Sequence, residues 1–340
     1  MPRSKPEEPF LKYLIDEVDP ERTFLNAPYQ PDATQVDTPY AFIGLPFGPP
    51  YHATDLTLCA GGADEVRKES YRQAYALNWD HYDFDYGDVL FPGDTPTVTD
   101  LGTLPSDFRN PDAVWDDGID LFTTLISRGT VPLVVGAFDS IPPIIGGAFT
   151  AEKINVLQID SHLDFRHERY GVTRGFSSPM RRLREYPWVN DIVQVGLRGA
   201  GSARAQDIKD ALDSGNRLIT AWDVHEHGAQ KVLDSLTSDG RWLITIDCDG
   251  LDTSIAPAIG AREPGGLTFH EARTLVSGLA RRNKVAALVF TEYQPALDIQ
   301  SITAHTILRL MINVIGTQRS PKAEVPFTSS SRGTPESTRR

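Results

Sequence analysis

Seven short apolar runs, separated by segments of helical length, constrain the fold of this chain more than any other feature. Each run is continuously apolar rather than alternating, which is typical of strands covered on both faces. Alternation of such strands with helices predicts parallel βαβ units wound into one sheet. The runs are YAFIGL (40–45), VPLVVG (131–136), INVLQI (154–159), IVQVGL (192–197), RLITAW (217–222), WLITID (242–247) and AALVFT (286–291).

The segments between the runs have the length and composition of helices. In residues 270–282, apolar side chains recur at Ala272, Leu275, Val276 and Leu279, which is the stripe of an amphipathic helix. Helices are predicted at about 61–77, 111–128, 142–150, 203–214, 227–237, 269–282 and 299–315.

The domain organisation follows from the composition along the chain. Residues 1–37 are polar and contain several prolines, so we expect an N-terminal arm outside the core. Residues 319–340 are rich in Ser, Pro, Thr and Arg and predict a disordered tail. Because no repeat or linker interrupts the middle, residues 38–318 are expected to form a single α/β domain.

Charge and cysteine usage exclude several classes of partner. The chain has 33 Lys and Arg against 46 Asp and Glu, a net charge of -13, which disfavours nucleic acid and anionic membranes. Its two cysteines, Cys59 and Cys248, form no disulfide framework and indicate a reducing compartment. The sequence shows neither an apolar signal peptide nor a membrane-length stretch, so we expect a soluble, cytoplasmic protein with a small-molecule substrate.

Acidic residues follow four of the seven runs, where ligands bind in parallel sheets. One Asp at a strand end is usually a helix N-cap, and Asp252 is typical of a turn. The patterns D-x-H-x-D and D-x-D together are a stronger signal of one shared site. The residues concerned are Asp139 after 131–136, Asp160, His162 and Asp164 after 154–159, Asp247 and Asp249 at the end of 242–247, and Glu292 after 286–291.

This set of side chains predicts a binuclear metal site. Alternation along an extended chain lets Asp160, His162 and Asp164 share one face, and Asp247 and Asp249 another. Aspartates gathered in one crevice repel each other strongly without cations. Two divalent ions about 3.5 Å apart, bridged by carboxylates, relieve this repulsion and activate a water as nucleophile. Carboxylates with one imidazole favour Mn²⁺ or Mg²⁺ over Zn²⁺.

At this point the chain resembles the ureohydrolase family of arginases, agmatinases and related amidinohydrolases, over roughly residues 40–316. The resemblance implies a three-layer α/β/α fold with a mostly parallel, about eight-stranded sheet, a binuclear manganese site, and a trimer or hexamer. The similar segments are DSHLD (160–164) for D-A-H-x-D, TIDCDGLDTSIAPAIGAREPGGLT (245–268) for the family's S-x-D-x-D motif, TEYQP (291–295) for E-x-x-P, and GADEVRKES (62–70), DYGDV (85–89) and VGLRG (195–199).

The resemblance also implies roles for the metal ligands. Asp160 and Asp247 would bridge the two ions. Asp164 would bind the first ion, and His162 and Asp249 the second.

The same resemblance implies how a substrate would react. Asp164 would hold the bridging hydroxide and pass a proton to the leaving amine. Glu292 would accept hydrogen bonds from a guanidinium and orient its central carbon. The implied reaction is hydrolysis of a guanidine to urea and an amine.

The first departure from the family pattern lies in GAFDS (136–140), which stands where the family has G-G-D-H-S. Asp139 replaces a metal-binding histidine, and Phe138 replaces an aspartate. Asp139 can still bind a divalent ion, but it adds one negative charge. We expect this charge to raise the pKa of a bound water. Tighter binding of Ca²⁺ or Mg²⁺ is another outcome of an added carboxylate.

The second departure is Phe176 in GFSSPMRR (175–182), where the family has a histidine that transfers protons and contacts substrate. General acid–base help is worth roughly 10²–10⁴ in rate. His167 lies nearby in sequence, although a surface or capping role is the more common one for such a histidine. Ala258, Ile259 and Arg262 also change a turn near the metals.

Three functions remain open at this level. The first is a metal-dependent hydrolase of a linear C–N bond in a cationic guanidino compound, similar to agmatinase or arginase. The second is an enzyme of the same fold with altered substrate or chemistry, because Phe138 and Phe176 make the pocket more apolar. The third is a non-catalytic paralogue that binds a metal or a partner.

Overall fold

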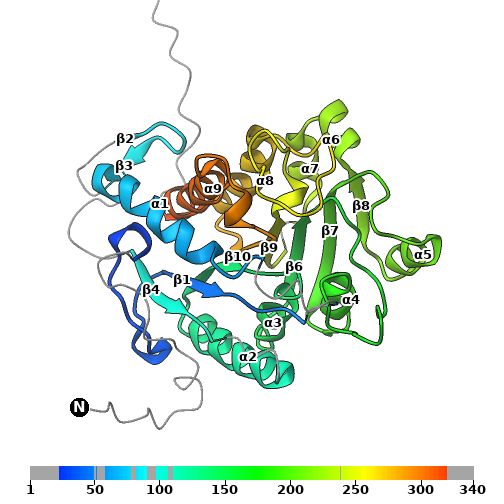
Figure 1. The fold of residues 1–340 in the computed structure, drawn as a ribbon, viewed down its shortest axis with the longest axis horizontal. Coiled ribbons are helices and arrows are strands. Elements are labelled where there is room, and N and C mark those ends of the chain that lie inside the picture. Colours follow the sequence, from blue (N-terminus) through cyan, green and yellow to red (C-terminus); the bar gives the residue numbers. More distant parts are fainter. Residues whose placement is uncertain are drawn as a thin grey trace, which may run out of the picture.

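A single eight-stranded sheet forms the centre of the molecule (Figure 1). The computed structural model describes residues 23–49, 51, 58–77, 82–89, 97–105, 110–237 and 239–319. The strand order is β4-β1-β5-β10-β9-β6-β7-β8, and every neighbouring pair is parallel. The strands are β1 (Tyr40–Leu45), β4 (Val98–Thr103), β5 (Val131–Gly136), β6 (Ile154–Ile159), β7 (Val189–Leu197), β8 (Arg217–Thr220), β9 (Arg241–Asp247) and β10 (Val285–Thr291).

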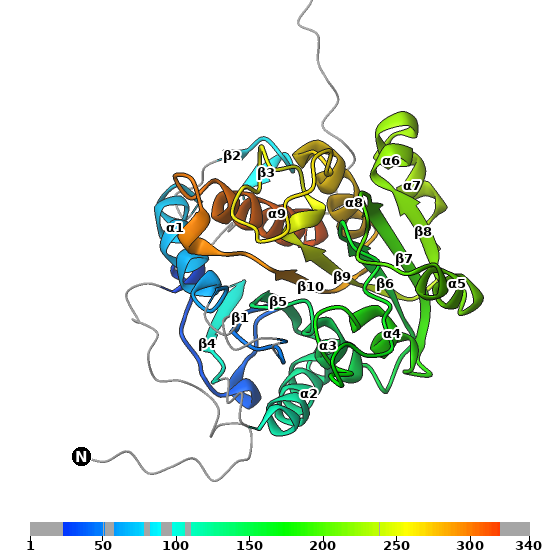
Figure 2. The ribbon, with the colours of Figure 1, turned by 45° about the vertical axis from the view of Figure 1, so that its right-hand side comes forward.

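Helices cover both faces of the sheet, which confirms the expected three-layer α/β/α architecture (Figures 1 and 2). One layer contains α1 (Gly62–Leu77), α6 (Ala221–His227), α7 (Ala229–Ser235), α8 (Phe269–Arg281) and α9 (Ile302–Arg319). The other contains α2 (Pro111–Ser127), α3 (Pro142–Gly147), α4 (Pro179–Arg184) and α5 (Ala205–Asp213). Each layer buries its own apolar cluster against one face of the sheet.

All seven apolar runs are strands of this sheet, and the eighth strand, β4, escaped prediction. Its sequence, VTDLGT, contains a buried charge at Asp100, so it does not read as an apolar run. The guanidinium of Arg67 on α1 donates to both carboxylate oxygens of Asp100, at 2.9 and 3.0 Å. A polar residue can therefore occupy this buried strand because its partner comes from elsewhere in the chain.

Two helices, α4 and α6, were also not predicted. They contain six and seven residues, too few for a helical period to stand out in the sequence. The run 217–222 ends as a strand at Thr220, because Thr220 caps α6. The Thr220 hydroxyl accepts from the Asp223 amide at 3.1 Å, and the Asp223 carboxylate accepts from the Thr220 amide at 3.0 Å. The segment DYGDV forms part of a small hairpin, β2 (Tyr82–Asp83) and β3 (Asp88–Val89), outside the central sheet.

The described part of the expected N-terminal arm belongs to the core. Phe24 is fully buried and stacks on Phe42 of β1 with ring centroids 4.3 Å apart. The amide of Leu25 donates to Ser70 of α1 at 2.8 Å. The prediction of an arm outside the core is therefore wrong for residues 23–36. Their composition is mostly polar, but a few apolar side chains among them are buried in the core. Residues 1–22 and 320–340 lie outside the described part of the chain, so the disordered tail stays a prediction.

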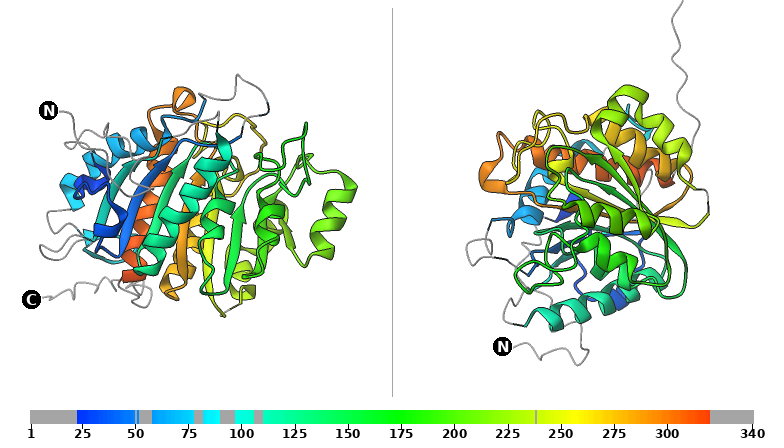
Figure 3. Two further views of the ribbon diagram at one scale, coloured as in Figure 1. Left: turned by 90° about the horizontal axis from the view of Figure 1, so that it is seen from below. Right: turned by 90° about the vertical axis from the view of Figure 1, so that its right-hand side faces the viewer.

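The carboxyl ends of the strands gather along one edge of the sheet (Figure 3). In the part of the chain that the structure describes, no helix is both long and apolar enough to cross a membrane.

Candidate metal centre

Strand register brings the four acidic loops to one point of that edge. β5, β10, β9 and β6 are consecutive in the sheet. Val135 pairs with Phe290, Thr291 pairs with Asp247, and Ile246 pairs with Ile159. These four strands therefore end at nearly the same level, about 4.8 Å apart in the hydrogen-bonding direction. The residues that follow them must lie within reach of one another.

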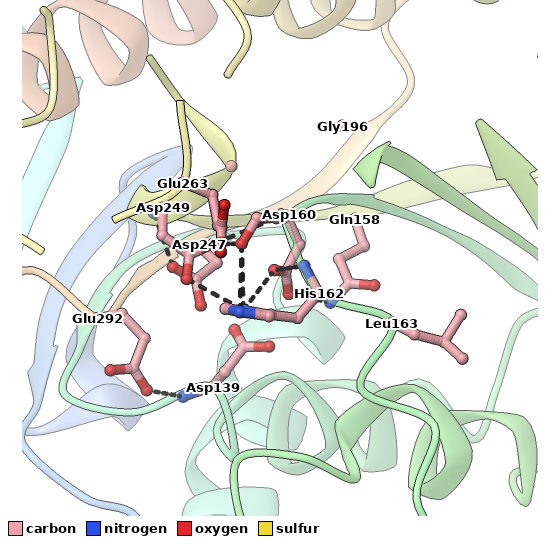
Figure 4. A network of polar contacts seen from close by, with 12 residues as sticks. Asp139, Gln158, Asp160, His162, Leu163, Gly196, Asp247, Asp249, Glu263 and Glu292 are labelled. Atoms are coloured by element: carbon pink, nitrogen blue, oxygen red, sulfur yellow. Dashed lines mark hydrogen bonds and ion pairs between the residues drawn. The ribbon is translucent and has the colours of Figure 1, made fainter. Parts of the chain in front are cut away.

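Ligand atoms from these loops form two groups that share one residue. Atoms of Asp160, His162 and Asp249 all lie within 4.8 Å of one another, and so do atoms of Asp139, Asp160 and Asp247. Figure 4 shows the carboxylates arranged around the His162 ring. Because Asp160 belongs to both groups, its carboxylate lies where two cations could be held side by side.

Asp164 and Glu292 line the same cavity as these ligands but belong to neither group. Asp164 is buried, with a positive φ of 47°, and Glu292 has a φ of 59°. Such φ values are uncommon for residues other than glycine and are often found at functional sites. The Glu292 carboxylate accepts from the backbone amide of Asp139 at 3.3 Å. Of the expected ligands in the described chain, only Asp164 belongs to neither group.

Hydrogen bonds hold the ligand carboxylates in fixed positions. Asp160 accepts from the His162 amide at 2.6 Å through Oδ1, and its Oδ2 accepts from the Gln158 side chain at 2.5 Å. Asp249 accepts from the hydroxyl and amide of Ser161 at 2.7 and 3.2 Å. The donors to Asp160 lie two residues from it in the chain, whereas Ser161 reaches Asp249 across 88 residues and so ties the loop after β6 to the loop after β9.

The buried amide of Gln158 continues into a chain of hydrogen bonds that sequence reasoning missed. Gln194 of β7 donates to Gln158 at 2.6 Å, Asn216 donates to Gln194 at 2.9 Å, and Arg184 donates to Asn216 at 3.1 and 2.9 Å. This chain of amides links the surface of α4 to Asp160. A signal was present in the sequence, because one glutamine interrupts each of two neighbouring apolar runs.

Arg198 is a second residue that sequence reasoning missed. Its buried guanidinium donates to the backbone carbonyls of Asp249 at 2.5 Å and Glu263 at 2.8 Å. It thus holds the loop that follows β9 without contacting a ligand carboxylate. Its place at the end of β7, in VGLRG, was the only available signal.

Burial and mutual repulsion dominate the electrostatics of the carboxylates. Burial, followed by the charge of Asp249, raises the pKa of Asp160 to about 8. Burial also raises the pKa values of Asp139, Asp164 and Asp247, and the charge of a neighbouring carboxylate adds to each. These groups cannot all ionise at neutral pH unless positive charge is added.

His162 is the single cationic side chain among the predicted ligands. Burial lowers its pKa, but hydrogen bonds to Asp160 and Asp249 outweigh burial and raise it to about 12. Its Nδ1 lies 3.1 Å from Asp249 Oδ2. Burial also works against ionisation of Asp249, yet the hydrogen bonds from His162 and Ser161 lower the pKa of this carboxyl overall.

The residues present fit divalent metal ions. Asp139 is 1% exposed; its Oδ1 accepts from the Thr291 hydroxyl at 2.6 Å, while Oδ2 has no hydrogen-bond partner. A buried carboxylate oxygen without a partner is costly, and it lies in one of the two ligand groups. Oxygen ligands with one imidazole suit Mn²⁺ or Mg²⁺. The donor set therefore suits divalent metal ions.

A cavity of about 220 Å³ opens above these ligands. This volume lies below that of most small-molecule sites, which run from roughly 300 Å³ upwards, so the cavity suits a small substrate. Burial and the charge of Asp139 raise the pKa of Glu292, so a cation in the cavity would favour its ionised form. The lining residues are Asp139, His162, Asp164, Arg169, Phe176, Ser177, Ser202, Asp247, Asp249, Gly260, Ala261 and Glu292.

One aromatic ring, that of Phe176, lines this cavity, and two further rings pack behind it. Phe176 stacks on Phe138 with centroids 6.0 Å apart and packs against Tyr51 at 4.3 Å. His167 is exposed and does not line the cavity, so it does not stand in for the histidine absent at position 176. Asp252 caps a turn by accepting from the Ser254 amide at 3.0 Å, as expected.

Comparisons with known proteins agree with this fold. The sequence model of the arginase family matches residues 39–316. An arginase of Brucella melitensis is 28% identical over 213 residues, which cover 56% of this chain and 65% of that protein. The mitochondrial agmatinase of Gallus gallus is 26% identical over 292 residues, 83% of this chain and 81% of that protein.

The fold also matches solved structures. The crystal structure of a formimidoylglutamase from Bacillus subtilis superposes with a TM-score of 0.73 at 21% identity, covering 88% of this chain and 93% of the other. At this identity the likeness concerns the fold, whereas the match of the family model extends over most of the sequence. The chain therefore belongs to the arginase family, whose members are ureohydrolase-type hydrolases.

Proposed function

We propose that this protein is a metal-dependent hydrolase of a linear C–N bond in a small guanidino compound, releasing urea and an amine. The observation that carries the proposal is the position of Asp160, shared by two groups of ligand atoms beneath a cavity. Membership of the arginase family supports the class of reaction. The relatives include an arginase and an agmatinase, which makes a guanidine the first substrate class to test.

The proposed metal ligands divide between two ions. Asp139, Asp160, Asp164 and Asp247 would hold one ion, and Asp160, Asp247, His162 and Asp249 the other, with Mn²⁺ preferred over Mg²⁺ or Ca²⁺. The oxygen-rich donor set and the unpartnered Oδ2 of Asp139 support this assignment. When bound, such a pair of ions lowers the pKa of water so that it becomes a nucleophile at neutral pH.

The remaining roles belong to side chains of the cavity. Glu292 accepts hydrogen bonds from the guanidinium and orients its carbon towards the metal ligands. Arrival of this cation stabilises the ionised form of Glu292, whose pKa is otherwise raised by burial. Asp164, which lines the cavity, takes up a proton and passes it to the departing amine.

Asp139 and Phe176 replace two histidines of the family pattern, and both replacements should slow the reaction. Asp139 adds a negative charge beside the ions, which raises the pKa of water and shifts the rise of activity to higher pH. Phe176 cannot transfer a proton, so a factor of roughly 10²–10⁴ from general acid–base help is absent. We therefore expect slow turnover with an alkaline optimum.

A second candidate is hydrolysis of a less cationic amidino or formimidoyl compound. Phe176 favours it, because this ring, supported by Phe138 and Tyr51, places apolar surface in the lining of the cavity. The same metal ligands would serve either reaction.

The first test combines metal content with turnover. Elemental analysis of protein purified without added metal should find manganese, and loading with Mn²⁺ should bring it to two ions per chain. Release of urea, or of formamide or another simple amide, together with the amine is then followed for a panel of guanidino, amidino and formimidoyl compounds from pH 7 to 10. Formamide or another simple amide without urea would favour the second candidate. Fewer than one bound ion, or silence across the panel, would favour a non-catalytic paralogue.

Assembly and compartment complete the proposal. We propose a homo-oligomer, trimeric or hexameric, located in the cytoplasm. The mass in solution is measured by light scattering coupled to size-exclusion chromatography, and a monomer at micromolar concentration would contradict this expectation.

A further inference from the structure

Arg169 occupies an unusual position at the cavity, on a tight two-residue hairpin. Its backbone amide and carbonyl exchange hydrogen bonds with Val172 at 3.0 and 2.9 Å. Between them, Tyr170 and Gly171 both have positive φ, at 53° and 81°, the pattern of a type I′ turn. Such a turn fixes the direction in which the side chain of Arg169 extends from the backbone. The side chain is one of those that line the cavity.

Two tyrosine rings hold the guanidinium of Arg169. Its central carbon lies 4.9 Å from the centroid of Tyr51 and 5.2 Å from that of Tyr170. Tyr51 is itself fixed, because its hydroxyl accepts from the Ser177 amide at 3.1 Å. Gly175 allows this approach, since a side chain there would meet the Tyr51 ring at 2.5 Å. The cation is thus positioned before any ligand arrives.

The hydrogen-bonding edge of this guanidinium is free. Among the residues that the structure describes, Arg169 makes ring contacts through its face, and no carboxylate or carbonyl bonds its N–H groups. Other arginines of the same loop are engaged: Arg166 with the Ser202 carbonyl and Arg174 with Asp112. A planar cation with five N–H donors, stacked through its face, is suited to bind a carboxylate along its edge.

The cavity therefore has opposite charges on its lining. Its ligand carboxylates and Glu292 would receive metal ions and a guanidinium, whereas Arg169 offers the single unpaired arginine among the described lining residues. A second positive group on the substrate would be repelled at Arg169, and an anionic group would be attracted. Phe176 lies in the same lining and suits an apolar spacer between the two ends.

We propose that Arg169 binds a carboxylate at the end of the substrate opposite its guanidinium, so that the protein selects ω-guanidino acids over guanidino amines. This rests on the proposed function, because it assumes that the guanidino end reaches the metal ligands. Arg169 is in this view a residue that determines specificity and takes no part in proton transfer.

The test uses three guanidines that carry the same four-carbon chain, which ends in a carboxylate in 5-guanidinopentanoate, in an amine in agmatine and in no polar group in butylguanidine. In the manganese-loaded protein, we expect kcat/KM for the acid to exceed that for the amine by about 10- to 100-fold, the range of a charge-assisted hydrogen bond. R169Q should lower kcat/KM for the acid by a similar factor, mainly through KM, and leave butylguanidine nearly unchanged. R169E should reverse the preference towards agmatine.

Matched controls separate the charge of Arg169 from general damage. R174Q removes another arginine of the same loop, which pairs with exposed Asp112 outside the cavity, and should leave all three substrates unchanged. R169K keeps the charge without the planar fork and should retain part of the preference for the acid. Thermal unfolding of each variant checks that the fold is kept.

The outcomes distinguish failure of this inference from failure of the proposed function. Equal or faster turnover of agmatine, or an R169Q variant that still prefers the acid, would overturn the role of Arg169 while leaving the hydrolase intact. Calorimetric titration with 5-guanidinopentanoate gives a second readout when no compound is hydrolysed. Binding that R169Q weakens would then support the carboxylate site alone, and no binding at millimolar concentration would refute it.

Discussion

The same sheet carries one buried carboxylate on β4 and a cluster of buried carboxylates at the ends of β5, β6 and β9, and their charges are neutralised in opposite ways. On β4, Asp100 is fully buried, and four donors satisfy it: two from Arg67, at 2.9 and 3.0 Å, and the amides of Phe24 at 2.7 Å and Gly102 at 2.8 Å. At the ends of β5, β6 and β9, the carboxylates instead face one another. In the described part of the chain, no lysine or arginine forms an ion pair with them.

The difference separates a structural charge from a functional one. The charge of Asp100 is neutralised within the chain, so this site needs no further ion. The charges of Asp139, Asp160 and Asp247 exceed what the single imidazole of His162 can neutralise, so protons or cations from solution must balance the rest. Arg198 passes close by, but its guanidinium binds backbone carbonyls. A cluster of carboxylates with one imidazole and no lysine or arginine partner among the described residues is therefore suited to bind cations.

The largest expected effect comes from Asp247→Asn at the proposed metal centre. Loss of one proposed ligand should lower kcat by at least about 10³-fold, because metal ions supply several kcal/mol of transition-state stabilisation. Without metal, the variant should be as stable as the parent or more so, since it removes one repelling charge. Activity, bound manganese and unfolding temperature with and without chelator are measured. Full activity in the variant would remove Asp247 from the ligand set.

Asp100→Asn should lower the stability of the fold, in contrast to Asp247→Asn, which should lower activity. It leaves Arg67 buried without its full partner, which typically costs about 3–5 kcal/mol in stability. Denaturant unfolding should show this loss equally with and without Mn²⁺, because the ion pair lies outside the metal centre. If the loss appeared only in metal-loaded protein, the division between the two groups of carboxylates would not hold.

The pH dependence of stability sharpens the comparison further. The pKa of Asp160 is about 8 in the metal-free fold, against about 3.9 in the unfolded chain, so the folded state binds more protons between these values. Stability of the metal-free protein should therefore fall as pH rises from 5 to 8, by up to about 1.4 kcal/mol per pH unit for each such group. His162, with a pKa near 12 instead of about 6.5, acts in the same direction above pH 6.5.

Unfolding temperatures measured across this pH range with chelator, and again with Mn²⁺, check the prediction. Bound metal should flatten or reverse the slope, because it replaces the protons. Asp160→Asn should reduce the slope without metal. A metal-free protein whose stability rises with pH would contradict the raised pKa of Asp160.

The smallest expected effect concerns the amide chain behind Asp160. Gln158→Leu removes the donor to Asp160 Oδ2 and should weaken manganese binding or activity by about 10- to 100-fold, as is usual for residues that orient ligands. Asn216→Ala, two hydrogen bonds further away, should have a weaker effect in the same direction. Calorimetric titration with Mn²⁺ measures both. Equal effects at the two positions would indicate general loosening of the sheet.

Local patterns predicted most of the secondary structure and the acidic residues of the site. Continuous apolar runs identified seven of the eight strands because strands covered on both faces tolerate few polar residues. The runs also marked where each strand ends, and so where Asp139, Asp160, Asp247 and Glu292 begin their loops. β4 and the first core residues escaped because distant partners make their burial favourable. Arg67 lies 33 residues from Asp100.

The sequence by itself determined which residues stand at strand ends and which kinds of ligand atom they carry. Only the tertiary structure decided which of them meet. The sheet places β10 between β5 and β9, out of chain order, so Glu292 contacts Asp139 across 153 residues. Arg169 is likewise positioned by a residue from another loop, because its guanidinium lies over the ring of Tyr51. Local patterns reflect neighbours in the chain, whereas sheet order and loop packing depend on the free energy of the whole fold.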